Sequence, residues 1–209
     1  MIERHSPRFD TYYHLLSHLH QERSPRTYLE IGVHEGHSLN LVHPATLVIG
    51  IDPEPKIEHP LPPTFEIITA TSDDYFESLD GQSPFGELPI DMAFVDGMHH
   101  VEFALRDFMN LERLASPDST ILVHDCRPID ELTACRDRST VVWSGDIWKL
   151  IPFLNQHRPD LDIVVHDVEP TGLAEISNLD PANTTLAAGY DSWIADLIAM
   201  PFSQYSAAD

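Results

Sequence analysis

The chain has 209 residues, 42% of them hydrophobic, and its 34 acidic against 12 basic side chains give a formal net charge of −22. This length and apolar content predict one well-filled domain and exclude a disordered chain. A surface this negative would repel phosphate groups, so neither nucleic acid nor an anionic membrane is expected as a partner. Only two of the basic residues are lysines, Lys56 and Lys149, which fits either a salt-adapted or a GC-rich source.

No segment has the pattern of a leader or a membrane span. The first ten residues lack an apolar stretch, and no run approaches the roughly 18 apolar residues that a spanning helix needs. The two cysteines, Cys126 and Cys135, are too few for a disulfide framework and form no Cys-x-x-Cys pair. We therefore expect a soluble, cytoplasmic protein. The sequence does not determine the oligomeric state, and a homo-oligomer stays open.

Segments of helical and of strand character alternate along the chain. Helical apolar spacing covers residues 9–22, and a second, clearer stripe covers residues 99–115. Short apolar runs of strand character stand at 27–31, 46–52, 65–70, 90–96 and 120–125. A helix at 145–157, strands at 161–168 and 172–179, and an apolar segment at 191–200 that covers the domain edge complete the prediction.

This alternation predicts an α/β protein with a doubly wound, mostly parallel seven-stranded sheet and helices on both faces. Residues 1–209 would form a single domain, with a cofactor-binding core over 27–125 and the substrate side and sheet edge over 126–209. Ligands of such sheets bind at the carboxyl ends of the strands. Polar residues and turn glycines gather at those ends here: Glu30, Gly32, Gly36, Asp52, Ser72, Asp73, Asp96, His99, His100, His124 and Asp125.

The stretch "TYLEIGVHEGHSL" (27–39) runs from a strand into a loop shaped by Gly32 and Gly36, with Glu30 just before it. Asp52 ends the next strand about 20 residues later, the spacing at which a carboxylate binds the hydroxyls of an adenosine ribose. A dinucleotide would need Gly-x-Gly-x-x-Gly, and Glu30 and Glu35 would repel its pyrophosphate. S-adenosylmethionine has no phosphate and carries an ammonium and a sulfonium, so the acidic loop favours this cofactor.

The motifs "LEIGVHEG", "GID" and "DMAFVDGMHH" with "LVHD" resemble the successive motifs of class I S-adenosylmethionine-dependent methyltransferases. The stretch 96–102, "DGMHHVE", is similar to the "DGDHSYE" of bacterial small-molecule O-methyltransferases, which include macrolide-sugar and rhamnosyl methyltransferases. The resemblance implies a sheet whose last strand is antiparallel, and methylation of a hydroxyl on a sugar or natural product. It also implies cofactor contacts at Glu30, Gly32, Asp52 and the Ser72–Asp73 turn.

The same resemblance implies the chemistry. The histidine that matches His99 is the base in relatives, and in several of them the acid matching Asp96 and an acid pair after the next strand hold Mg²⁺. Here Met98 replaces an acidic residue, and His124 stands where the first acid of the pair is common. An imidazole at this position favours Zn²⁺ or another transition metal, or no metal at all. The catalytic candidates are therefore His99, Asp96 and Asp125, with Asp96 also next to the cofactor, and the candidate ligands of Mg²⁺ or another divalent metal are Asp96, Asp125 and His124.

Several alternatives stay open. Ser72 and Asp73 could cap the following helix, either together with or instead of contacting adenine, and His100 could be a helix-start or surface residue. Trp143, Trp148 and Trp193 fit a core or lid position better than a substrate platform, and Tyr12 and Tyr13 fit the core better than a substrate cleft. At the level of function, a protein that binds S-adenosylmethionine without chemistry is the alternative, and a nucleotide-dependent oxidoreductase is disfavoured by the broken glycine pattern.

Overall fold

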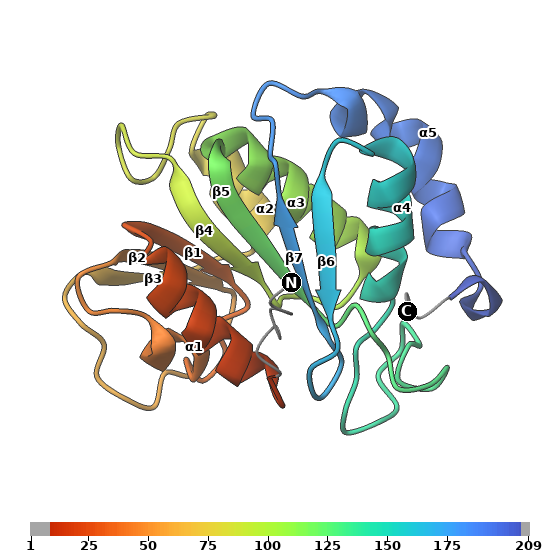
Figure 1. Cartoon of the computed structure of the whole chain (residues 1–209), viewed down its shortest axis with the longest axis horizontal. Coiled ribbons are helices and arrows are strands. Elements are labelled where there is room, and N and C mark those ends of the chain that lie inside the picture. The colour runs from red at the N-terminus through yellow and green to blue at the C-terminus, as the bar shows by residue number, and fades with distance from the viewer. Residues whose placement is uncertain (1–8, 206–209) are drawn as a thin grey trace, which may run out of the picture.

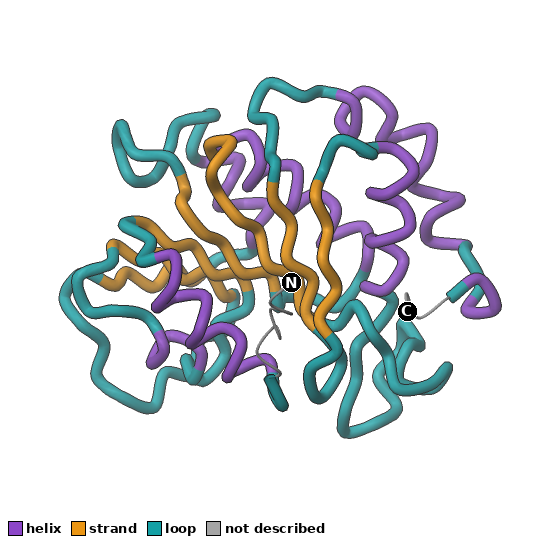
Figure 2. Tube along the Cα trace, in the orientation of Figure 1, coloured by secondary structure: helices purple, strands orange, loops and turns teal. Residues whose placement is uncertain are grey.

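The computed structural model describes residues 9–205, which form a central sheet with helices packed on it (Figures 1 and 2). Its strands are β1 (Thr27–Ile31), β2 (Leu47–Asp52), β3 (Phe65–Thr69), β4 (Ile90–Val95), β5 (Ala115–His124), β6 (Asp162–His166) and β7 (Leu173–Ser177). Its α-helices are α1 (Tyr12–Arg23), α2 (Ser72–Ser78), α3 (Val101–Leu114), α4 (Leu150–His157) and α5 (Thr185–Ala199). Three short 3-10 turns are η1 (Ser38–Leu41), η2 (Ile147–Lys149) and η3 (Phe202–Gln204).

The seven strands lie in the order β3-β2-β1-β4-β5-β7-β6. Neighbours from β3 to β5 pair in parallel, whereas β7 is antiparallel to both β5 and β6. The predicted fold class is therefore confirmed, including the antiparallel last strand. Each predicted strand is present at nearly its predicted position, except that β5 begins at Ala115, where a polar stretch extends the pairing with β4 across a register shift.

The two faces of the sheet are covered unequally. One apolar core lies between the sheet and α2, α3, α4 and α5, and the other lies under α1 and η1. Short helical patterns were expected between all the strands, but the connection from β1 to β2 holds only η1, and the connection from β2 to β3 holds no helix. The latter segment, 53–64, contains five prolines, which lack the N–H that a helix interior needs.

The helix α3 carries the predicted apolar stripe and is buried along it at Val101, Ala104, Leu105, Phe108 and Leu111. Its first residue is capped from far along the chain, because the Val101 N–H donates to Asp146 Oδ1 at 2.9 Å. This bond fixes where α3 begins relative to the end of β4, and so it positions the loop 96–100 that connects them.

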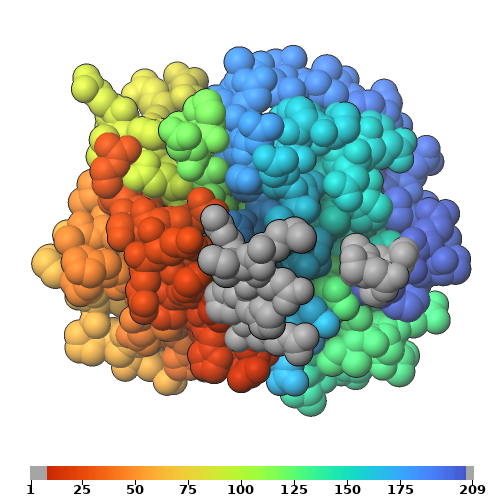
Figure 3. Space-filling view, in the orientation of Figure 1, coloured from red at the N-terminus to blue at the C-terminus, as the bar shows by residue number. Residues whose placement is uncertain are grey.

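The helix α1 reaches the same edge of the sheet from the opposite face. The Tyr12 N–H donates to the Glu169 carbonyl at 3.0 Å, which joins the start of α1 to the turn between β6 and β7. On the face seen in Figure 3, the N-terminal third of the described chain lies at the left and the C-terminal third lies at the right. Within residues 9–205, the helices are all too short or too polar to cross a membrane.

Candidate functional site

The carboxyl ends of β1, β2 and β4 meet through a tight backbone contact at Gly32. The Gly32 N–H donates to the Ile51 carbonyl at 2.9 Å, and the Asp96 N–H donates to the Ile31 carbonyl at 2.8 Å. Gly32 has φ +88°, and a Cβ at this position would lie 2.0 Å from the Asp96 carbonyl oxygen. Only glycine therefore allows the loop after β1 to lie against the end of β4.

Glu30 lies beneath this loop and is fully buried. Its carboxyl group accepts hydrogen bonds from the Tyr28 hydroxyl at 2.8 Å and from the Ser38 hydroxyl at 2.5 Å. Burial raises the pKa of Glu30 to about 7, although both hydroxyl bonds lower it. Through the bond to Ser38, Glu30 connects the end of β1 to η1 and supports the loop from its buried side.

Asp52 accepts hydrogen bonds from two backbone N–H groups, one of them in the same loop. Its Oδ2 accepts from the His34 N–H at 2.8 Å, and its Oδ1 accepts from the Glu54 N–H at 2.7 Å. A carboxylate has about four lone-pair sites, so two remain for further donors. Gly36 shapes the far end of the loop with φ +78°, where a Cβ would lie 2.8 Å from the Ile57 side chain.

The Ser72–Asp73 turn points toward α3. The N-cap of α2 is Thr71, whose hydroxyl accepts a backbone N–H at 3.2 Å, so the expectation that Ser72 or Asp73 caps this helix is wrong. Asp73 accepts two hydrogen bonds from Arg106, at 2.8 and 2.6 Å. The Ser72 hydroxyl bonds the carboxyl group of Asp107.

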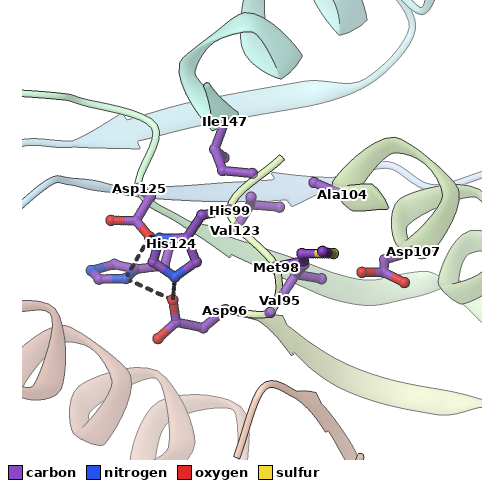
Figure 4. Close-up of a pocket in the computed structure, with 11 residues that line it drawn as sticks. Val95, Asp96, Met98, His99, Ala104, Asp107, Val123, His124, Asp125 and Ile147 are labelled. Atoms are coloured by element: carbon purple, nitrogen blue, oxygen red, sulfur yellow. Dashed lines mark hydrogen bonds and ion pairs between the residues drawn. The ribbon is translucent and has the colours of Figure 1, made fainter. Parts of the chain in front are cut away.

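Four predicted residues from the ends of β4 and β5 come together in one acid–imidazole cluster: Asp96, His99, His124 and Asp125 (Figure 4). His124 Nδ1 lies 3.1 Å from Asp96 Oδ1 and 3.6 Å from Asp125 Oδ2. His99 Nδ1 lies 3.0 Å from Asp125 Oδ2, and its Nε2 lies 3.5 Å from Asp96 Oδ1. Each imidazole thus contacts both carboxylates.

The charges in the acid–imidazole cluster stabilise one another. Burial alone would raise the pKa of Asp96, but the two histidines outweigh it and lower this pKa below its usual range. Burial alone would lower the pKa of His99, yet its hydrogen bonds and charge attraction to the two aspartates raise it to about 10. The pKa of His124 is likewise raised by both aspartates against the effect of burial. Without a ligand, the two aspartates therefore favour the charged forms of both histidines.

The backbone at this point is unusual for side-chain-bearing residues. His99 has φ +53° and Asp125 has φ +67°, a left-handed conformation that costs roughly 1–3 kcal/mol for a residue with a side chain. The prediction that His99 and His100 are neighbours on a helix is wrong, because α3 begins at Val101 and His100 is its N-cap. The left-handed residue, and not a helical spacing, directs His99 toward Asp96.

Two aromatic residues pack against the imidazoles of the cluster. The Trp143 ring stacks on His99 with centroids 4.9 Å apart, and the Trp143 carbonyl oxygen lies 2.8 Å from His99 Nδ1. On the other side, the Tyr12 ring lies 4.1 Å from the His124 ring. His100 faces elsewhere, with its Nε2 3.1 Å from the Arg136 carbonyl oxygen.

Trp143 belongs to a strap, residues 126–144, for which the sequence predicted no helix or strand. Arg136 in the strap binds Glu102 on α3 through two hydrogen bonds, at 2.9 and 2.5 Å, and binds Asp146 at 2.7 Å. Lys149 also binds Asp146, at 2.9 Å. The strap is thus fixed to the first turn of α3, beside the cluster.

Sequence reasoning missed two further residues of the site. Thr171 donates its hydroxyl proton to Asp125 Oδ1 at 2.5 Å and so orients this carboxylate. Asp107 is buried on α3 and lines a narrow crevice of about 10 Å³ together with members of the cluster, Met98 and Ala104. No local sequence signal marks either residue, because the partners of both come from distant segments.

Comparison with known proteins agrees with this geometry. Residues 29–126 match a family model described as a methyltransferase domain. The match spans the loop after β1, the end of β2 and the whole acid–imidazole cluster. A search of curated protein sequences found no match.

Solved methyltransferase structures share the fold over most of the chain. The O-methyltransferase TomG from Streptomyces achromogenes, solved with SAM, is 21% identical with a TM-score of 0.60, over 78% of this chain and 77% of that one. An O-methyltransferase from Bacillus cereus, solved with SAH, is 16% identical with a TM-score of 0.60, over 84% and 83%. A putative caffeoyl-CoA O-methyltransferase from Staphylococcus aureus is 16% identical with a TM-score of 0.59, over 81% and 84%. These solved structures thus share the fold of this chain, while the narrower likeness to macrolide-sugar enzymes stays a prediction.

Proposed function

We propose that this protein is an S-adenosylmethionine-dependent methyltransferase that methylates a hydroxyl group of a small molecule. The observation that carries the proposal is the acid–imidazole cluster, which lies at the carboxyl edge of the sheet directly beside the loop after β1. The Asp96 carbonyl contacts Gly32 of that loop, while the Asp96 side chain contacts His99. One residue therefore connects the cofactor loop to the candidate base.

The cofactor would lie along the loop after β1. The free lone pairs of Asp52 suit the two ribose hydroxyls. Gly32 and Gly36 let the cofactor approach the backbone closely. The ionised Asp96 would favour the positive end of the cofactor, whereas Glu30 acts from beneath as a brace of the loop.

His99 is the base in this proposal, and its surroundings select the reacting nitrogen. Nδ1 faces two acceptors, Asp125 Oδ2 at 3.0 Å and the Trp143 carbonyl at 2.8 Å, so Nδ1 carries a proton. Nε2 is then the nitrogen that accepts the proton of the hydroxyl group. Asp125 and Trp143 position the ring, as an orienting carboxylate does for other catalytic histidines.

Methyl transfer would be an in-line displacement. The acceptor oxygen forms a bond to the methyl carbon as the carbon–sulfur bond breaks, its electron pair goes to sulfur, and the hydroxyl proton goes to His99 Nε2. Alignment of oxygen and methyl could contribute up to about 7–11 kcal/mol, and a positioned base adds roughly 10²–10⁴-fold. The pKa of about 10 means that Nε2 is largely protonated at neutral pH until the positive charge of the bound cofactor weakens its attraction to Asp96.

The cluster also has the donors of a divalent metal site. Ligand atoms of Asp96, His124 and Asp125 all lie within 4.8 Å of one another. The separations of 3.1 and 3.6 Å from His124 Nδ1 to the two carboxylates suit donors that share one cation with bonds of about 2.0–2.2 Å. A bound cation would act as a Lewis acid and lower the pKa of the acceptor hydroxyl. The imidazole favours a transition metal over Mg²⁺.

Binding and transfer experiments test the proposal in sequence. We expect calorimetry to show binding of S-adenosylmethionine and its demethylated product, but not of NAD. Transfer from methyl-labelled cofactor to a panel of sugars and phenols should then yield a methylated product. Cofactor binding with no transfer to any hydroxyl compound would favour the alternative, a binding protein without chemistry, and NAD binding would favour the oxidoreductase. A structure with S-adenosylhomocysteine would show the acceptor cleft beside the sulfur.

A further inference from the structure

Asp146 lies outside the acid–imidazole cluster but binds the backbone that carries His99. Its N–H donates to the His99 carbonyl at 3.2 Å, and its Oδ1 accepts from the Val101 N–H at 2.9 Å. One residue thus bonds the chain on both sides of His100, where the loop after β4 becomes α3. The Val101 N–H is one of the groups that a helix leaves without an internal partner, so Asp146 also completes the start of α3.

The residue before Asp146 packs against the same carbonyl group. Gly145 has φ +56°, and a Cβ at this position would lie 1.8 Å from the His99 carbonyl oxygen and 2.9 Å from the His99 Cβ. Only glycine therefore allows the turn to lie directly against the His99 backbone. Because Trp143 contacts the His99 ring, residues 143–146 hold both the backbone and the ring of His99.

These contacts act on a strained residue. His99 has φ +53°, which is costly for a residue with a side chain and persists only where the surroundings fix it. Rotation of residue 99 out of the left-handed region would turn its carbonyl away from the Asp146 N–H and its ring away from Asp125 and Trp143. The Asp146 bond therefore opposes the relaxation that would remove this ring from the cluster.

The Asp146 carboxylate is itself held by two cations. Its Oδ2 accepts from Arg136 at 2.7 Å and from Lys149 at 2.9 Å, and Asp146 is only 1% exposed. Lys149 also donates to the Ile198 carbonyl at 2.6 Å, near the end of α5. A buried charge network is rigid when its members are paired, whereas loss of one partner leaves an uncompensated buried charge. The network thus fixes the turn that holds His99 to α5 and the strap.

We infer that Asp146 is a positioning residue of the methyl-transfer reaction, which holds His99 in the conformation that places its ring on Asp125. This inference rests on the proposed function, because it takes His99 as the base. Asp146 acts through the backbone of His99 and not on the reacting atoms. Such an effect is large enough to measure, because a displacement of about 1 Å can cost about 10²-fold in rate.

A double-mutant cycle separates positioning from a general structural role. Asp146→Asn keeps the backbone N–H and the size of the side chain but removes the charge that binds Arg136 and Lys149. We expect it to lower single-turnover methyl transfer at least 10-fold, while the affinity for S-adenosylmethionine changes less than 2-fold. In the His99→Ala background the same substitution should lower transfer less than 2-fold, because the residue that it positions is gone. Gly145→Ala, which places a methyl group against the His99 carbonyl, should show the same pattern.

Glu112→Gln is the matched control. Glu112 is a buried carboxylate near the other end of α3 from Val101, and it binds Arg158 through two hydrogen bonds, at 2.6 and 2.9 Å. The control should lower the unfolding temperature about as much as Asp146→Asn but change methyl transfer less than 2-fold. A crystal structure of Asp146→Asn gives a readout besides activity, and it should show the ring of residue 99 displaced from Asp125.

Equal fold-losses from Asp146→Asn in the wild-type and His99→Ala backgrounds would overturn the inference, since a structural role predicts additive effects. Undiminished transfer by Asp146→Asn would overturn it as well. If Asp146→Asn does not fold, Gly145→Ala decides in the same cycle. If the wild-type protein methylates no acceptor, the proposed function fails, and the variant structure still decides whether Asp146 holds His99. An unmoved His99 in that structure would refute the positioning role.

Discussion

Replacement of Asp52 tests the cofactor site most directly. In the structure, its two oxygens accept the His34 N–H at 2.8 Å and the Glu54 N–H at 2.7 Å. Asp52→Ala would remove these loop contacts together with the acceptors for the ribose. A hydrogen bond to a charged acceptor contributes about 1.5–3 kcal/mol. We therefore expect S-adenosylhomocysteine affinity to fall by about 10- to 150-fold.

Calorimetric titration of the folded variant measures this loss. Glu54→Ala is the control, because it removes an exposed negative charge two residues away and leaves the Glu54 backbone N–H in place. The control should change affinity less than 2-fold. Thermal unfolding without ligand shows whether the loop contacts alone destabilise the protein. Unchanged affinity in Asp52→Ala, or NAD binding as tight as that of the adenosyl ligand, would refute the reasoning.

The remaining predictions concern the base, the metal and the effect of pH. In single-turnover assays, His99→Ala should lower methyl transfer by roughly 10²-fold or more with nearly unchanged cofactor affinity, whereas His100→Ala should cost far less. If His100→Ala is instead the variant that loses activity, His100 and not His99 is the base. If both variants stay active, Asp125 is the next candidate for the base. Rigorous chelation should lower activity, with Mn²⁺ or Zn²⁺ restoring it better than Mg²⁺, and full activity after chelation would show that the aspartates act without metal. Burial lowers the pKa of His20 to about 4, so its contribution to stability is complete above about pH 6.5 and is lost as pH falls toward 4. Urea denaturation should show the wild-type protein losing about 2 kcal/mol more than His20→Phe between pH 7 and pH 5, and equal losses would contradict this.

The strands and the loop after β1 were predictable because local signals and the final packing agree. Every residue of β1 is buried, and β4 is buried at five of its six positions, as continuous apolar runs predict for a parallel sheet covered on both faces. Gly32 and Gly36 occupy left-handed positions that the glycine pattern indicates. The same burial explains why the sequence does not predict which face of the sheet the Glu30 side chain lies on. Because β1 is buried on both faces, its polar and apolar residues do not alternate.

The strap and the Asp107 position were not predictable because long-range contacts determine them. Arg136 binds Glu102 across 34 residues, and Thr171 binds Asp125 across 46. No periodic pattern marks either pair, and an isolated arginine or threonine in a polar segment has many possible partners. The position of Asp107 was not predictable for the same reason, because its partner Ser72 lies on a different helix.

Backbone strain bears on the choice between an enzyme and a protein that only binds the cofactor. His99 and Asp125 both hold left-handed φ angles, at roughly 1–3 kcal/mol each, although glycine or asparagine would adopt them at lower cost. Surrounding contacts maintain both conformations: the Asp146 N–H donates to the His99 carbonyl at 3.2 Å, and the Asp125 N–H donates to the Gly172 carbonyl at 3.2 Å. Cofactor binding at Asp52 and the glycine loop requires neither strained residue. Ser24, His34, Asp80 and Asn178 also have positive φ angles, so what distinguishes His99 and Asp125 is that two such residues contact each other. A chain that keeps an imidazole and a carboxylate in strained positions 3.0 Å apart is therefore better explained by proton transfer than by binding alone.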